Sequence, residues 1–138
     1  MFKHQIRIAY REVTVGNHVY YARYLDILEV SRNEAFRAWG VPLLRLQEEH
    51  VIFPVVECNL RYHSPARYDD LLTNEITISE LGKVQFTIHY QIKKDSSLLV
   101  TATTRHVATN LEEKPVRIPQ ELHTVLSSHL SSADQGFS

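Results

Sequence analysis

Residues 71–109 alternate between apolar and polar side chains in three segments, which two short polar turns separate. Period-two alternation is typical of half-buried strands, and connections this short join antiparallel neighbours. The sequence therefore predicts an antiparallel three-stranded meander as the centre of the fold. The strands are expected at 71–81, 84–93 and 98–109, with turns at Gly82-Lys83 and Asp95-Ser96-Ser97.

One long helix is predicted ahead of this meander, over residues 20–39. Gly40 and Pro42 follow it, and this order of residues is typical of a helix C-terminus. Successive helical residues turn by about 100°, which gathers most apolar side chains on one stripe suited to packing against a sheet. The stripe consists of Tyr21, Leu25, Leu28, Ala35, Phe36 and Trp39.

Three further elements complete the predicted order. Residues 3–11 alternate as a strand does, and residues 51–62 are extended, with Pro54 indicating a sheet edge or a bulge. Pro119 opens a short C-terminal helix. The order of strand, long helix and then several strands favours an α+β fold, in which an antiparallel sheet covers one side of the helix.

The composition is that of an ordinary globular protein, with 43% hydrophobic and 22% charged residues. A net charge of -1 gives no global attraction for nucleic acid or an anionic membrane. Cys58 is the one cysteine, which excludes an internal disulfide and a cysteine zinc cluster. No run of about 18 apolar residues occurs, so we expect a cytoplasmic protein without a membrane span. One domain is expected over residues 1–130, followed by a flexible Ser-rich tail over residues 131–138.

Arg32 is the residue that fits the predicted helix least, because it falls within the apolar stripe. Burying a guanidinium is costly unless it is paired, and Glu29 lies three residues earlier at the edge of the stripe. Two interpretations stay open. Either a Glu29–Arg32 pair lets the arginine lie in the core or at a subunit contact, or the stripe borders a cavity with a polar site.

The loop before the helix gathers polar and turn-forming residues, which are Glu12, Thr14, Gly16, Asn17 and His18. Backbone N–H groups at a helix start are unsatisfied and carry a partial positive charge. Those of residues 19–21, with Tyr20 at the centre, can therefore polarise the carbonyl oxygen of a substrate. Ordinary capping and turn chemistry produces such clusters more often than catalysis does.

Two stretches of the chain resemble motifs of hot-dog-fold acyl-CoA thioesterases of the 4-hydroxybenzoyl-CoA thioesterase-like group. Residues 10–25 are similar to the approximate signature D-x-D-x-x-G-x-V-x-x-x-x-Y-L, and Glu29 and Arg32 fill the E-x-x-R that follows it. Residues 61–71 are similar to the group's R-Y-x-x-P-A-R-Y-x-D segment. The resemblance covers residues 5–108, and the loop also resembles that of thioesterases from enediyne polyketide pathways, which lack the same acid.

The resemblance implies a helix wrapped by a five- or six-stranded antiparallel sheet, in dimers that commonly form tetramers with active sites at the dimer interface. The implied reaction is hydrolysis of an acyl thioester of coenzyme A or of an acyl carrier protein, without a metal or redox cofactor. Tyr24, Arg61 and Arg67 are the candidates for binding this substrate, since arginines suit the phosphates of coenzyme A. A structural alternative is that the two arginines pair with Asp69 and Asp70.

The sequence departs from the family at Thr14, where the resemblance implies a second acid that serves as nucleophile or general base. A threonine hydroxyl without an obvious base is a poor nucleophile. In one interpretation Glu12 or Glu29 supplies the base. In another, Thr14 and Asn17 position a water while the helix-start amides and Arg32 stabilise the oxyanion. In the third, the protein binds acyl groups without hydrolysing them.

His18 has two possible roles: histidine side chains ordinarily titrate near neutrality, so it can act as a general base, or it can orient the loop. A hot-dog dehydratase or hydratase is a further alternative. Such enzymes need an acid–base histidine with an acid across the dimer, and the motifs of this chain do not match theirs. The sequence therefore predicts a thioester hydrolase.

Overall fold

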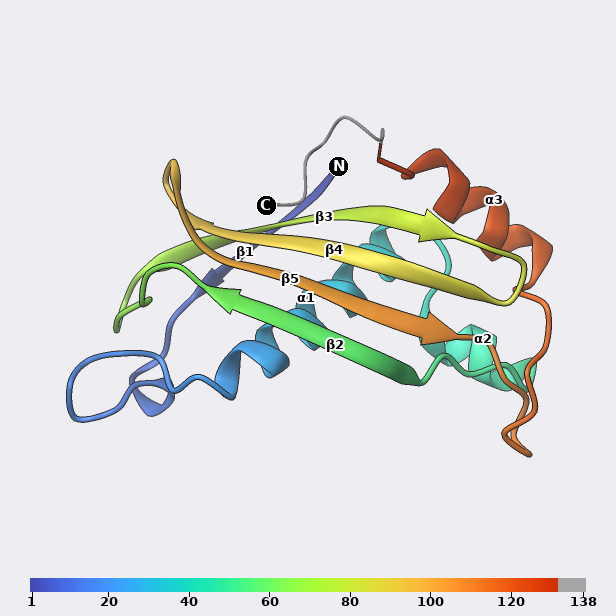
Figure 1. The fold of residues 1–138 in the computed structure, drawn as a ribbon, viewed down its shortest axis with the longest axis horizontal. Coiled ribbons are helices and arrows are strands. Elements are labelled where there is room, and N and C mark those ends of the chain that lie inside the picture. Colours follow the sequence, from blue (N-terminus) through green and yellow to red (C-terminus); the bar gives the residue numbers. More distant parts are fainter. Residues whose placement is uncertain (132–138) are drawn as a thin grey trace.

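The computed structural model describes residues 1–131, and its centre is a five-stranded antiparallel sheet with strand order β1-β3-β4-β5-β2 (Figure 1). The predicted meander is confirmed as β3-β4-β5, with β1 and β2 at the two edges. In chain order the elements are β1 (Phe2–Arg7), the short 3-10 helix η1 (Tyr10–Glu12), α1 (Arg23–Ala38), α2 (Leu43–Glu48), β2 (Val55–Tyr62), β3 (Leu71–Leu81), β4 (Gln85–Lys94), β5 (Ser97–Val107) and α3 (Gln120–Ser128).

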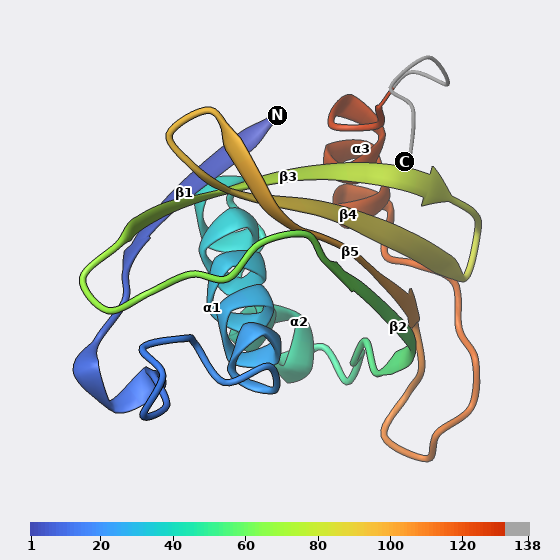
Figure 2. The same cartoon turned by 60° about the vertical axis from the view of Figure 1, so that its left-hand side comes forward.

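The inner face of the sheet is largely apolar, and α1 lies across it in both views (Figure 1, Figure 2). The register places Ile76 beside Tyr90, and Tyr90 beside Ala102, on this face. A shift of one residue would turn every buried side chain to the opposite face, so burial selects this register. A helix wrapped by a five-stranded antiparallel sheet is the hot-dog arrangement, which confirms the predicted α+β class.

Helix α1 begins at Arg23, later than predicted, and buries a stripe that is turned from the predicted one. The prediction was wrong for Tyr21 and Leu25, which are 63% and 48% exposed, whereas Tyr24 and Ile27 are buried. The helix has apolar residues toward two neighbours, the sheet and a groove beside β2, and helical periodicity cannot decide which side is covered. The prediction is confirmed for three residues, which are buried: Leu28, Ala35 and Phe36.

The segment between α1 and β3 contains one unpredicted helix. Helix α2 has six residues, fewer than two turns, so its sequence shows no clear periodicity; Leu46 anchors it in the core. Strand β2 begins directly after Pro54, lies at the sheet edge and has a register shift near its start. The prediction of an edge or a bulge at Pro54 is confirmed, since proline has no N–H to donate to a neighbouring strand.

The C-terminal part follows the predicted order. Helix α3 begins after Pro119 and packs its apolar side against β3. Beyond it, the amide of Ser131 donates to the carbonyl of Ile78 at 2.7 Å. The rest of the predicted flexible tail, residues 132–138, lies outside the described residues. In the described part of the chain, no helix is both long and apolar enough to cross a bilayer.

Replacing Leu28 by alanine is expected to lower the free energy of unfolding by about 3 kcal/mol, because this 1% exposed side chain fills space between α1 and the sheet. Leu44→Ala is the matched control. Leu44 is 68% exposed on α2, and its loss should cost less than about 0.5 kcal/mol. Denaturant unfolding measures both values, and equal losses would contradict the packing described for α1.

Candidate functional site

The loop between η1 and α1 is closed by its own backbone hydrogen bonds. The Thr14 amide donates to the carbonyl of His18 at 2.8 Å, and the Asn17 amide donates to the carbonyl of Thr14 at 2.9 Å. Asn17 has a φ of 59°, in the left-handed region that asparagine tolerates better than most residues. The turn gathers the exposed side chains of Thr14, Asn17 and His18 at one tip.

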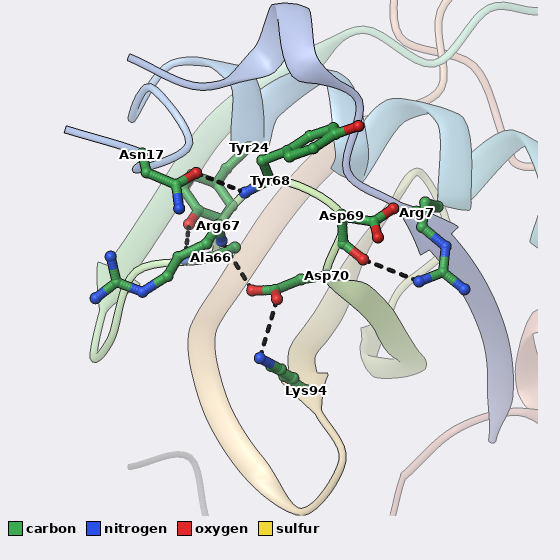
Figure 3. A network of polar contacts seen from close by, with 9 residues as sticks. All are labelled: Arg7, Asn17, Tyr24, Ala66, Arg67, Tyr68, Asp69, Asp70 and Lys94. Carbon is green, nitrogen blue, oxygen red and sulfur yellow. Dashed lines mark hydrogen bonds and ion pairs between the residues drawn. The ribbon is translucent and has the colours of Figure 1, made fainter. Parts of the chain in front are cut away.

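Residues 66–70, which we call the latch, belong to the second motif and hold this loop (Figure 3). The side-chain oxygen of Asn17 accepts a hydrogen bond from the Tyr68 amide at 3.0 Å. The Val19 amide donates to the carbonyl of Ala66 at 2.9 Å. One motif therefore fixes the conformation of the other.

Asp69 and Asp70 tie the latch to the sheet. Asp70 accepts a hydrogen bond from the Arg67 amide at 2.8 Å and forms an ion pair with Lys94 at 2.9 Å. Partial burial alone would raise the pKa of Asp70, but these two hydrogen bonds hold that pKa below its ordinary value. The carbonyl of Asp69 accepts a hydrogen bond from the guanidinium of Arg7. The guanidinium of Arg67 points away from Asp70 in Figure 3, and the ion pair considered for it is not found.

Glu12 and Tyr24 are two further predicted site residues that have structural partners. The carboxylate of Glu12 accepts a hydrogen bond from the Ala9 amide at 2.9 Å, which closes η1. The hydroxyl of Tyr24 accepts from the Ala66 amide at 3.1 Å, and burial raises the pKa of this tyrosine. Both side chains support the loop, and their roles in catalysis and substrate binding stay predictions.

The backbone amides expected at the helix start are largely occupied. Val19 and Tyr20 already donate to backbone carbonyls, at 2.9 Å and 3.1 Å, because the helix begins at Arg23 and the loop holds the residues before it. These two amides therefore have backbone partners already, and their role in stabilising an oxyanion stays a prediction. The amide of Tyr21 has no backbone partner within residues 1–131.

Arg32 is held by a series of hydrogen bonds that we call the Arg32 chain. Its Nη1 donates to the hydroxyl of Tyr90 at 3.2 Å, and this hydroxyl lies 2.6 Å from Oγ1 of Thr104. Oγ1 of Thr104 lies 2.9 Å from Nε2 of His106, whose Nδ1 lies 3.0 Å from the carbonyl oxygen of Phe53. Sequence reasoning missed Thr104 and His106, although strand alternation puts both on the inner face, where polar residues are unusual.

The protonation of His106 sets the direction of this chain. Burial, reinforced by the charge of Arg32, lowers the pKa of His106 to about 4, despite the opposing bond to Phe53, so the ring is neutral near pH 7. A carbonyl can only accept, which places the ring proton on Nδ1 and makes Nε2 the acceptor for Thr104. Thr104 then accepts from Tyr90, and Tyr90 accepts from Arg32. Every member of the chain is satisfied, and the guanidinium is held in one place.

Glu29 lies one helical turn before Arg32, on the same side of α1. The considered ion pair between them does not form within 4.0 Å, and the carboxylate of Glu29 has no polar partner within residues 1–131. Both residues line a pocket of about 340 Å³ next to α2 and a hollow of about 320 Å³ next to β2. They therefore form the boundary between two adjoining hollows.

The predicted catalytic residues fall into two groups along α1. The loop group, which includes Thr14 and His18, precedes the helix, whereas Glu29 and Arg32 lie on it. At about 1.5 Å per residue, the helix advances roughly 13 Å from Arg23 to Arg32. A single chain does not bring the two groups together.

Arg61 and Arg67 also lie apart from Glu29 and Arg32. Leu60 packs against the core and Tyr62 contacts the ring of Tyr24, so Arg61 between them faces the outer side of the sheet. Neither guanidinium makes an ion pair within the described chain. Their role in binding coenzyme A stays a prediction. Among residues 1–131, no group of three or more His, Cys, Asp or Glu side chains has a metal-site arrangement.

Comparisons with known proteins agree with this architecture. The profile of the thioesterase-like superfamily matches residues 9–126. An acyl-CoA thioesterase of Haemophilus influenzae is 29% identical over 88% of this chain and 90% of its own. The crystal structure of a probable thioesterase from Bartonella henselae is 32% identical, with a TM-score of 0.81 over 86% of this chain and 98% of its own. The dynemicin thioesterase, at 16% identity, shares the fold alone, with a TM-score of 0.87 over 95% of this chain and 98% of its own.

The neutral His106 is expected to make stability depend on pH. Its pKa is about 4 in the folded protein against an ordinary 6.5. Between these values the unfolded chain binds more protons, so the free energy of unfolding falls as the pH drops. When the pH falls from about 7 to about 5, the free energy of unfolding of the unmodified protein should decrease by about 2 kcal/mol more than that of His106→Gln, whose glutamine does not titrate.

Denaturant unfolding at the two pH values measures this difference. His123→Gln is the control, because His123 lies outside the Arg32 chain and this variant should keep the pH dependence of the unmodified protein. Parallel pH profiles for the unmodified protein and His106→Gln would contradict the neutral buried ring.

Proposed function

Because the chain belongs to the thioesterase-like superfamily, we propose that it hydrolyses acyl-CoA thioesters to the free acid and coenzyme A. The observation that carries this proposal is the match over residues 9–126, which includes the loop and both Glu29 and Arg32. The relative described as an acyl-CoA thioesterase favours coenzyme A over a carrier protein as the thiol. A carrier protein thioester is the alternative substrate.

A second copy of the chain is proposed to pair along β2. This strand lies at the sheet edge, and Val55 and Val56 are 44% and 49% exposed. A sheet edge offers unpaired N–H and C=O groups to another strand, and monomers usually avoid exposed apolar side chains at such an edge. Two-fold pairing of β2 with itself is antiparallel and extends one sheet through both copies.

Such a dimer places the loop of one copy beside Arg32 of the other. Tyr24 contacts Tyr62 near the end of β2, with ring centroids 5.4 Å apart, whereas Arg32 lines a hollow with Val55 at its start. Helix α1 therefore runs opposite to β2. Antiparallel pairing brings the start of one β2 next to the end of the other, so the two separated groups meet at the interface.

In this shared site Arg32 is proposed to donate hydrogen bonds to the thioester carbonyl oxygen as negative charge develops on it. The Arg32 chain uses one of its N–H groups and leaves others free. Glu29 is the proposed general base, because its carboxylate is exposed and has no partner within the described residues. It takes a proton from a water that attacks the carbonyl carbon, after which the C–S bond breaks and the thiolate leaves.

The loop contributes the opposite wall of the proposed site. The side-chain oxygen of Asn17 is bound to the latch, which leaves its amide nitrogen to donate. Thr14 can hold a water but cannot take its proton, so the base is assigned to Glu29, with His18 as second candidate. Glu12 is a weaker candidate, because its carboxylate already holds the Ala9 amide. The tetramer and the cytoplasmic location stay predictions.

Arg32→Ala and Glu29→Gln are expected to lower kcat/KM for acyl-CoA hydrolysis by about a hundredfold each, since one removes oxyanion stabilisation and the other the base. Arg37→Ala and Glu34→Gln are matched controls on the same helix; their side chains pair with each other and should leave turnover unchanged. The decrease in thioester ultraviolet absorbance measures the rate and avoids reaction of a thiol reagent with exposed Cys58.

The outcomes of this assay separate the candidate bases. No hydrolysis of short-chain, medium-chain or aromatic acyl-CoA, or of a carrier protein thioester, by the unmodified protein would contradict the proposed function. Full activity of Glu29→Gln together with loss in His18→Ala would assign the base to His18 instead. A higher rate in Thr14→Asp would show that a carboxylate at the position of the family's second acid can still act in this site.

The 16.0 kDa chain is expected to sediment as a dimer, at twice the mass of one chain. The double variant Val55→Lys, Val56→Lys is expected to sediment as a monomer, because like charges oppose pairing of the two edges. The kcat of the double variant should fall as well, since the proposed site needs both copies. Val30→Lys is the control on the other side of α1. Sedimentation velocity measures the mass, and a fully active monomer would overturn the shared site.

A further inference from the structure

Arg32 is held in place by a neutral group, so its positive charge is not cancelled. Its Nη1 donates to the hydroxyl of Tyr90 at 3.2 Å, and within residues 1–131 no carboxylate oxygen lies within 4.0 Å of this guanidinium. Burial raises the pKa of Tyr90, against the smaller opposing effect of the arginine's charge, so the hydroxyl keeps its proton. A carboxylate partner would also hold the guanidinium, but it would offset the charge that stabilises an oxyanion.

The hydroxyl of Tyr90 can hold Arg32 only while its own proton points elsewhere. A phenol hydroxyl has one proton to donate, and an arginine N–H needs a lone pair. Oγ1 of Thr104 lies 2.6 Å from the hydroxyl and is its one other hydrogen-bond partner within the described residues. When Thr104 accepts the proton of Tyr90, a lone pair of the tyrosine oxygen stays available for Arg32. The acceptor state of Thr104 therefore controls the contact with the guanidinium.

His106 keeps Thr104 in this acceptor state. Nε2 of the neutral ring lies 2.9 Å from Oγ1 of Thr104 and takes the threonine's proton, because Nδ1 donates to the carbonyl of Phe53 at 3.0 Å. The orientation of the ring is fixed as well, since it stacks on Phe86 with centroids 5.0 Å apart and an interplanar angle of 11°. Thr104 can then only accept from Tyr90. The direction of the whole Arg32 chain is thus set at its buried end.

The other side chains of the Arg32 chain are more deeply buried than Arg32 itself. Tyr90, Thr104 and His106 are 0%, 2% and 2% exposed, and they lie on the inner faces of β4 and β5. Arg32 is half-buried and lines both hollows of the candidate site. Because the hydrogen-bonding groups of the three buried residues are used within the Arg32 chain, these residues can act on a substrate only through the guanidinium.

We propose that Tyr90, Thr104 and His106 are positioning residues for thioester hydrolysis. Their neutral hydrogen bonds hold the guanidinium of Arg32 where the thioester carbonyl oxygen reacts, and they leave its full positive charge for the oxyanion. The observation that carries the inference is the unbroken series from the Phe53 carbonyl to Arg32, with contacts of 3.0, 2.9, 2.6 and 3.2 Å. The inference rests on the proposed function and adds how Arg32 is oriented.

Thr104→Val tests the inference, since valine has nearly the shape of threonine but no hydroxyl. With the acyl-CoA that the unmodified protein hydrolyses fastest, kcat should fall about tenfold and KM should change by less than about twofold, because a misplaced guanidinium loses mainly transition-state stabilisation. Thr104→Ser keeps a hydroxyl and should restore most of the kcat. Thr103→Val is the matched control on the outer face of β5, and it should leave kcat unchanged.

Combination with Arg32→Ala separates positioning from a general loss of core packing. If Thr104 acts through Arg32, then Thr104→Val should lower kcat no further in a protein that already carries Arg32→Ala. Tyr90→Phe deletes the other hydroxyl of the Arg32 chain and should follow the same pattern; if one of the two variants fails to fold, the other decides. An equal decrease in both backgrounds would overturn the inference, as would an unchanged kcat in Thr104→Val and Tyr90→Phe.

Nuclear magnetic resonance tests the Arg32 chain without catalysis. The Nη–H signals of Arg32, identified by their absence in Arg32→Lys, should be resolved from one another in the unmodified protein and in Thr104→Ser, because a held guanidinium rotates slowly. In Thr104→Val these signals should merge. Merged signals in the unmodified protein, or resolved signals in Thr104→Val, would overturn the inference even where hydrolysis is observed. If no thioester is hydrolysed, the proposed function fails, whereas resolved signals that merge in Thr104→Val would still support the held guanidinium.

Discussion

The burial of α1 against the inner face of the sheet is the interaction on which the other features depend. Ile27, Leu28 and Phe36 are almost completely removed from solvent there, and the loss of exposed apolar surface is the main favourable contribution to folding. With these residues fixed under the sheet, helical geometry turns Glu29 and Arg32 toward β2 and α2. The position of the candidate site is thus a consequence of how the core packs.

A guanidinium beside this core is tolerated because the sheet supplies its hydrogen-bond partners. Tyr90, Thr104 and His106 lie on the same inner face as the apolar core residues, and together they satisfy one another and Arg32. An unsatisfied buried polar group would cost free energy, whereas a complete network adds rigidity. Burial keeps His106 neutral, and its ring stacks on Phe86, so the network is anchored in the apolar core.

The two motifs that carry the family resemblance are coupled in the structure. The side chain of Asn17 and the backbone of Val19 bind the latch, and Asp70 binds the latch to the sheet through Lys94. Several groups of the second motif, among them the amide of Tyr68 and the carbonyl of Ala66, therefore hold the first motif in place. This arrangement explains why the motifs occur together although they are far apart in the sequence.

The sequence by itself determined the meander, the existence of the long helix and of α3, the α+β class and the family, because strand alternation, turn residues and local motifs depend on near neighbours in the chain. The rotation of α1, the partner of Arg32, the occupied amides before α1 and the separation of Glu29 and Arg32 from the loop were decided by the tertiary structure. Arg32 and Tyr90 are 58 positions apart, and Asn17 and Tyr68 are 51 apart. Contacts over such separations follow from how whole elements pack, which local periodicity does not encode.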